Sequence, residues 1–257
     1  MKLQGPRAPR PLVSEIALDK SISIDAERVS RALSVRIAAL GRATDWRGDD
    51  ASLAYASDDG NISIRLSTEV IASERLENAL ADAARWWTES ALIRNHTAVV
   101  TVTAASDTMP AIELAHLHVQ ATAALVDVAS AVGATTFGVF WNGERLYPAE
   151  FVQAHATTNP ALGLPVGFHV ATPGFATSIY TSGLPALGLK NIEAESTDDP
   201  AVSAPMVQNM ALYLITNGDV IHDGDTVGYS RTQKIRVRET DATWGGERVL
   251  RLSLTSV

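Results

Sequence analysis

Acidic residues and histidines at helical spacing are the first feature of this sequence that could do chemistry. Glu113 and His116 lie three positions apart and share one face of a helix, like the ligands of carboxylate-bridged metal centres. Such a centre needs a second pair and two further carboxylates, and the sequence offers no second pair. His118 is two positions from His116 and points in another direction. A solvated polar stripe explains the pair better, and we predict no metal or other cofactor.

Two other ligand-binding patterns are incomplete. Asp223 and Asp225 flank a glycine, but the later ligands of a calcium-binding loop are missing, so the segment reads as a turn. There is no Walker motif, and no Gly-x-Gly-x-x-Gly follows a predicted strand. Nucleotide binding is therefore not expected.

Ser182 is the strongest candidate nucleophile. It lies in Thr181-Ser182-Gly183, beside a predicted tight turn that follows a strand. A nucleophile elbow would require Gly-x-Ser-x-Gly and a following helix, and neither is present. The histidines that could act as its base are His96, His155, His169 and His222. A hydrolase-like site near Thr181–Gly188 stays open, and its candidate lining residues are Trp86, His96, Trp141, Thr181, Ser182 and Gly183.

A stripe of basic residues lies near the end of the sequence. Lys234, Arg236 and Arg238 alternate with apolar residues, so they point to one face of a strand. Arg251 can join them from the partner strand of a hairpin. The stripe is either a solvated sheet face defended by charge or a recognition surface for an acidic partner.

The composition limits the classes of function. There is no cysteine, which excludes disulfides and thiolate nucleophiles and suits the cytoplasm. The formal net charge is −8, and nucleic acid is a poor partner for such a surface because phosphate binding needs a basic footprint. No apolar run is long enough to span a membrane, and the first residues lack the apolar region of a secretory signal. We predict a cytoplasmic protein with no membrane contact.

The stretch from Leu76 to Thr103 is the element around which we expect the chain to be organised. Its first part has a helical apolar stripe ending at Trp87, and its last part alternates with a period of two and predicts a buried strand. Trp86 cannot share the face of Trp87, so it must flank the stripe. Core packing is its simpler role, and a stacking platform for a ligand is the alternative.

The remaining elements predict an α+β protein with antiparallel or mixed sheets. The first half reads as β-α-β-β-α-β, a ferredoxin-like order in which helices cover one face of a sheet. The second half adds a largely buried helix from Pro110, several strands, a helix whose first turn contains Pro205, and a closing hairpin. We expect a mobile tail over residues 1–11 and one compact unit over 12–257, with halves of about 12–105 and 106–257.

Four segments resemble one bacterial family of unknown function, numbered 4261. They are RWWTESALIRNHTAVVTVTA, TTFGVFWNGERLYPAEFV, YTSGLPALGLKNIEAE and MALYLITNGDVIHDGDTVGYSRTQKIRVR. The resemblance covers roughly Ile62 to Val257. It implies a soluble bacterial protein and assigns no reaction or catalytic residue. Families of this kind include neighbours of contact-dependent toxins and secretion systems.

These observations favour a non-enzymatic interaction protein of the bacterial cytoplasm. The sharper hypothesis is an immunity or accessory protein of a toxin or a type VI secretion system, with a protein as its partner. An enzyme with a site near Thr181–Gly188 is the alternative, and a self-associating structural subunit is the third reading.

Overall fold

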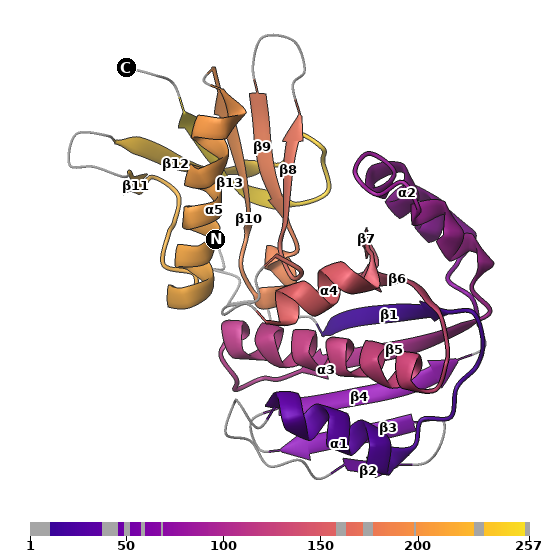
Figure 1. Ribbon diagram of the computed structural model, residues 1–257. Helices are drawn as coiled ribbons and strands as arrows, with labels where there is room; N and C mark the ends of the chain where they lie inside the picture. Colours follow the sequence, from indigo (N-terminus) through magenta and orange to yellow (C-terminus); the bar gives the residue numbers. More distant parts are fainter. Residues whose placement is uncertain are drawn as a thin grey trace. The chain divides into compact units, whose positions relative to one another are not determined.

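The chain divides into two compact units in the computed structural model, the first of residues 11–165 and the second of residues 166–257 (Figure 1). Both contain helices and a sheet, which confirms the predicted α+β class. The division lies later in the chain than the expected junction of the halves near residue 105. The predicted tail lies outside the described residues except for Pro11. The structure describes residues 11–37, 46–48, 52–57, 60–67, 69–157, 163–171, 177–197, 199–228 and 234–254.

The described part of the first unit is built on a seven-stranded antiparallel sheet, in the order β2-β3-β4-β5-β1-β6-β7. Strand β1 pairs with both β5 and β6, so that Ile16 faces Val100 on one side and Val139 on the other. The strands are β1 (Leu12–Leu18), β2 (Trp46–Gly48), β3 (Ser52–Ser57), β4 (Gly60–Ser67), β5 (Ala98–Ala105), β6 (Thr136–Trp141) and β7 (Arg145–Tyr147). The helices are α1 (Ala26–Ile37), α2 (Ser73–Ala83), α3 (Ala111–Ala131), α4 (Ala149–Ala156) and the short 3₁₀-helix η2 (Ser90–Asn95).

Helices cover both faces of this sheet, so the expectation of one covered face is wrong. On one face, α3 lies against β1 and β5, where the Ser14 and Thr122 hydroxyls are 2.7 Å apart. On the other, Leu76 and Leu80 of α2 pack in a buried cluster with Ala17. Successive residues of a strand point to opposite faces of its sheet. Strand β1 therefore presents apolar side chains to the helices on both faces.

The ferredoxin-like arrangement is also wrong. Helix α2 connects β4 to β5, which are adjacent and antiparallel, whereas a split βαβ unit connects parallel strands. The crossover in this unit is instead β5–α3–β6, whose two strands lie on either side of β1. Helix α3 is apolar on most of its circumference and is buried along most of its length. The expected junction near residue 105 therefore falls inside one sheet.

Helix α2 ends at Ala83, before the two tryptophans. Trp87 packs against the buried cluster beneath α2, as its place in the apolar stripe predicted. Trp86 is 50% exposed, and its ring centroid lies 5.8 Å from that of Phe151 and 6.1 Å from that of Tyr147. The pair thus joins α2 to the segment containing β7 and α4.

The second unit has a mixed six-stranded sheet in the order β11-β12-β13-β10-β9-β8, among the residues described. Strand β13 pairs with β10 in parallel and with β12 in antiparallel fashion. The strands are β8 (Gly167–Ala171), β9 (Thr177–Ser182), β10 (Asn191–Ser196), β11 (Thr226–Val227), β12 (Ile235–Asp241) and β13 (Arg248–Leu254), with the 3₁₀-helix η3 (Leu184–Leu187) between β9 and β10.

Helix α5 (Pro200–Asn217) covers one face of the second sheet. Its predicted stripe is confirmed, because Val207, Met210, Ala211 and Leu214 are all buried. Its predicted start is wrong: Asp199 is the N-cap, Pro200 is the first residue, and Pro205 lies inside the helix. Asp199 accepts a hydrogen bond from the Ala201 amide, which is the capping interaction expected for this residue type.

His118 is the most deeply buried titratable group of the first unit for which a pKa shift is resolved. Its Nε2–H donates to the Val102 carbonyl oxygen (3.2 Å), and its ring lies 4.7 Å from that of Trp141. Burial lowers the pKa of His118 to about 4, although the hydrogen bond to Val102 acts in the opposite direction. The folded protein therefore holds this histidine neutral over a range in which the unfolded chain protonates it.

This difference predicts a pH-dependent stability. Between about pH 6.5 and pH 4 only the unfolded state binds the proton, so the free energy of unfolding falls as the pH falls. The full contribution is about 3 kcal/mol. Urea unfolding of the intact protein at a series of pH values measures it. His118→Leu should flatten the slope, and His222→Leu, at an exposed position, is the matched control. An unchanged slope in His118→Leu would contradict the assignment.

Candidate functional site

The face of the second sheet opposite α5 carries a line of polar and aromatic side chains. His169 on β8 pairs with Tyr180 on β9, and Tyr180 pairs with Glu193 on β10. Glu193 pairs with Arg251 on β13, which in turn pairs with Arg238 on β12. Directly paired residues lie on the same side of a sheet, so these five side chains form one transverse row across five strands.

Glu193 is the centre of the transverse row and is fully buried. One carboxylate oxygen accepts from the Thr243 hydroxyl, and the other accepts from the Thr243 amide (3.2 Å) and from Arg251 Nη2 (3.0 Å). Arg251 also donates to the Asp241 carbonyl oxygen (2.9 Å). A buried carboxylate needs such compensation, and here it holds the loop between β12 and β13 against β10.

Aromatic rings occupy one end of the transverse row. The Tyr180 ring is stacked on the His169 ring at a centroid distance of 4.7 Å. The Trp244 ring also contacts the Tyr180 ring, at a centroid distance of 4.6 Å. Trp244 comes from the loop that Glu193 holds, is 44% exposed, and donates from Nε1 to Glu247 Oε1 (3.2 Å). The rings form a partly exposed aromatic surface.

Ser182 lies beside this aromatic end. Its Oγ is 2.9 Å from His169 Nε2, so the structure brings the candidate nucleophile to one of the four candidate bases. Gly183, which follows, is left-handed with φ of 92°, a conformation that glycine adopts at little cost. This bend ends β9 and starts η3 in place of the long helix that follows a nucleophile elbow.

Thr181 points away from Ser182 and has a structural role. Its hydroxyl accepts from the Ile192 amide (2.8 Å) and donates to Asn191 Oδ1 (3.3 Å). The Asn191 amide group donates to Glu247 Oε1 (2.9 Å), the same oxygen that Trp244 contacts. Thr181 thus fixes the position of η3 and β10 without being accessible, because its side chain is fully buried.

The predicted basic stripe occupies the other end of the row. Lys234, Arg236 and Arg238 are exposed, while the intervening Ile235 and Val237 are buried on the α5 side. The predicted alternation is therefore confirmed. Arg251 differs from these three residues because its guanidinium group forms an ion pair with Glu193.

Three predicted site-lining residues belong to the first unit. His96 is buried, donates from Nδ1 to the Ile93 carbonyl oxygen (2.6 Å) and accepts at Nε2 from the Ile71 amide (2.9 Å). Trp141 is buried against His118. Trp86 is the partly exposed member already described. His96 and Trp141 therefore connect core elements of the first unit.

The candidate metal ligands of α3 have other partners. His116 is partly buried, which lowers its pKa, and its Nε2 lies 3.5 Å from the amide nitrogen of Gln120. Over the ranges described, no group of three histidines, aspartates or glutamates is arranged to hold a metal ion. The Asp223–Asp225 segment is a turn in which each carboxylate accepts a backbone amide.

Several residues of the site were not predicted. Tyr180, Glu193, Thr243 and Trp244 received no role from the sequence, although the alternation of Asn191–Ser196 gave a signal for Glu193. A glutamate at an inward position of a predicted central strand requires a cationic partner, and Arg251 was available on the neighbouring hairpin.

Fold and site together define an α+β protein whose second sheet is covered by one helix on one face and carries an arginine-rich, aromatic opposite face. Residues 180–253 match the family described as Domain of unknown function (DUF4261). The match contains two of the four segments on which the resemblance was based, and it includes the transverse row except for His169. No curated protein and no solved structure matches the chain. Among the described helices, none is long and apolar enough to cross a membrane.

The Glu193 network predicts a large, specific loss of stability. Arg251→Met removes the cation from a fully buried carboxylate and should lower the free energy of unfolding by about 3 kcal/mol. Adding Glu193→Gln should recover part of this loss, which a double-mutant cycle in urea measures.

Arg248→Met is the matched control, since it changes the same residue type on the same strand. Its side chain is 54% exposed and pairs with Glu239 and Asp241 at the surface, so it should cost less than about 1 kcal/mol. Equal losses from Arg251→Met and Arg248→Met would show that burial of Glu193 does not depend on Arg251.

Proposed function

We propose that this chain is a non-enzymatic interaction protein that binds an acidic protein surface through the basic stripe of β12. The finer proposal is that the partner is a toxin or secretion component and that the chain acts as its immunity or accessory protein in the bacterial cytoplasm. The family resemblance supports that partner class, and the electrostatics of the second unit support the mode of binding.

The observation that carries the proposal is a difference in ion pairing. Among the described Lys and Arg residues of the second unit, Lys190, Arg248 and Arg251 each pair with a carboxylate, and the closest of these contacts is 3.0 Å. Lys234, Arg236 and Arg238 pair with none in the part of the chain that the structure describes. The protein has a net charge of −8. These three neighbouring cations differ from the other described Lys and Arg residues of the second unit because no carboxylate pairs with them.

The arrangement of the stripe also has an energetic cost. Arg238 lies directly opposite Arg251, and like charges in directly paired positions repel each other, although the ion pair of Arg251 with Glu193 (3.0 Å) offsets part of this repulsion. A partner with carboxylates would remove this repulsion on binding. Electrostatic complementarity between this stripe and an acidic surface would raise the association rate and the specificity.

The proposal predicts that the stripe is needed to retain a partner. Intact protein, immobilised at low salt, should capture one dominant protein from lysate of the source organism. The variant Lys234→Ala/Arg236→Ala/Arg238→Ala should lose it, and so should a rise in ionic strength, because salt screens exposed charges. Arg251 stays unchanged, since its replacement would disturb Glu193.

The control variant is Lys20→Ala/Arg28→Ala/Arg65→Ala, which removes three exposed positive charges from the first unit. It should retain the captured protein. Loss with both variants would point to net charge alone, and retention with both would remove the stripe from the interface. Either result contradicts the proposed binding mode.

A second candidate function is ester hydrolysis at Ser182, and the contact between Ser182 and His169 favours it. In this reaction the Ser182 Oγ attacks an ester carbonyl carbon while His169 Nε2 accepts its proton. The alcohol leaves with that proton, and water then releases the acid and restores Ser182.

A fluorophosphonate probe tests this candidate without knowledge of the substrate. If it is correct, the probe labels Ser182, and labelling is lost in Ser182→Ala and strongly reduced in His169→Gln. Ser178→Ala changes a serine on the same face of β9 and should label normally. Absence of labelling in the wild-type protein, measured by mass spectrometry, would remove the candidate.

A further inference from the structure

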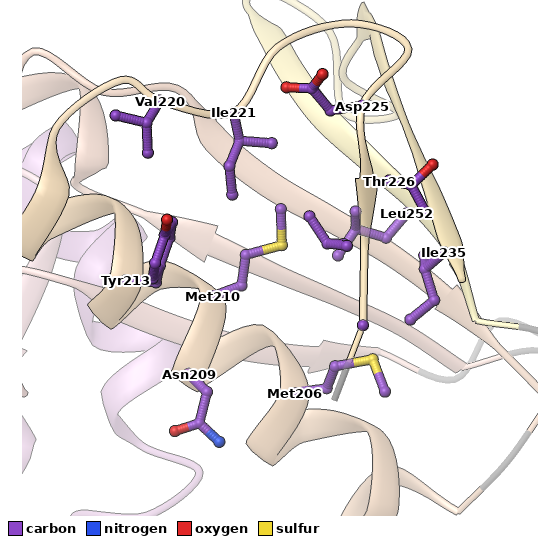
Figure 2. A pocket seen from close by; sticks show the side chains of 12 residues that line it. Met206, Asn209, Met210, Tyr213, Val220, Ile221, Asp225, Thr226, Ile235 and Leu252 are labelled. Atoms are coloured by element: carbon purple, nitrogen blue, oxygen red, sulfur yellow. The ribbon is translucent and has the colours of Figure 1, made fainter. Parts of the chain in front are cut away.

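A groove lies on the opposite side of the second sheet from the basic stripe, between α5 and the segment that leads into β11. Its volume is about 500 Å³, which is in the range of small-molecule sites. Met206, Met210 and Tyr213 line it from successive turns of α5, and Ile235 and Leu252 line it from the sheet (Figure 2). Most of its wall is therefore apolar.

Asp225 is the only charged residue among the described residues that line the groove. It lies beyond Ile221 on the same loop (Figure 2) and is exposed. One of its carboxylate oxygens accepts from the His222 amide (2.8 Å), which fixes the side chain. The other oxygen keeps acceptor capacity. The groove thus combines apolar side chains and the polar residues Asn209 and Thr226 with one carboxylate at its edge (Figure 2).

The shape and charge together define the ligand. Positions 206 and 213 of α5 are separated by about 10 Å along the helix axis, so the apolar wall suits an extended aliphatic chain. The methionines are unbranched and adapt to the shape of such a chain. A negative charge without a cation in the lining favours a positively charged head group and disfavours an anionic one.

We infer that this groove binds a small amphiphilic cation, with its aliphatic chain along α5 and its ammonium group at Asp225. The inference is independent of the proposed partner surface, because it rests on different residues on the other face of the sheet. It assigns a second, small-molecule site to the family-matched part of the chain.

Three probes of equal chain length separate the contributions of chain and charge. Octylamine, octanol and octanoate differ only in the head group. Octylamine should bind to the intact protein most tightly and octanoate most weakly. The difference between octylamine and octanol should be about three- to fivefold, the strength of an exposed ion pair.

Methyl-labelled methionine gives a direct readout by NMR. On addition of octylamine the Met206 and Met210 signals should shift with saturation, whereas Met109, which is buried in the first unit, should not. Met206→Trp fills the groove and should abolish the shift of Met210. Shifts of Met109 alone, or saturable binding unchanged in Met206→Trp, would place the ligand elsewhere and overturn the inference.

Asp225→Asn tests the charge while keeping an acceptor for the His222 amide. It should weaken octylamine to the affinity of octanol and leave octanol unchanged. Asp223→Asn is the matched control, because Asp223 also accepts a backbone amide, from Glu239 (2.9 Å), but does not line the groove. No saturable binding of any probe, equal binding of all three, or equal effects of the two variants would overturn the inference.

Discussion

The buried carboxylate of Glu193 is the constraint on which the polar half of the second unit depends. A charge at a fully buried position is tolerated only with a cation and hydrogen-bond donors, and two segments supply them. Arg251 comes from the neighbouring parallel strand, and Thr243 comes from the loop before it. The same loop carries Trp244 to Tyr180. One electrostatic requirement thus fixes a strand pair, a loop and the aromatic end of the transverse row.

Satisfying Glu193 also divides the basic residues into two groups. Arg251 forms an ion pair with Glu193, whereas Arg236 and Arg238 on the neighbouring strand are exposed to solvent. A stripe that looks uniform in sequence is therefore composed of one structural cation and several exposed ones. This distinction, rather than the number of arginines, is what makes the exposed stripe a candidate for recognition.

Local patterns in the sequence predicted much of the fold and less of the site. Period-two alternation gave β12 and β13, and helical periodicity gave α3 and the buried stripe of α5. The arrangement of the strands was not accessible, because the pairing of β1 with β5 and β6 depends on contacts between residues far apart in the chain. The Ser182–His169 contact and the Glu193–Arg251 ion pair likewise depend on how the strands are arranged. Each joins residues whose spacing carries no period, so only strand order brings them together.

The place of β13 in the sheet has a consequence for how the second unit forms. It is the last strand of the sheet in sequence, yet it lies in the interior, between β10 and β12. Its parallel pairing with β10 spans α5 and the whole intervening segment, which is the kind of non-local contact that slows folding. Until β13 is in place, β10 presents an unpaired inner edge and Glu193 has no cation. During synthesis β10 can therefore complete its pairing only after β13 has been made, and Glu193 gains its cation at that same point.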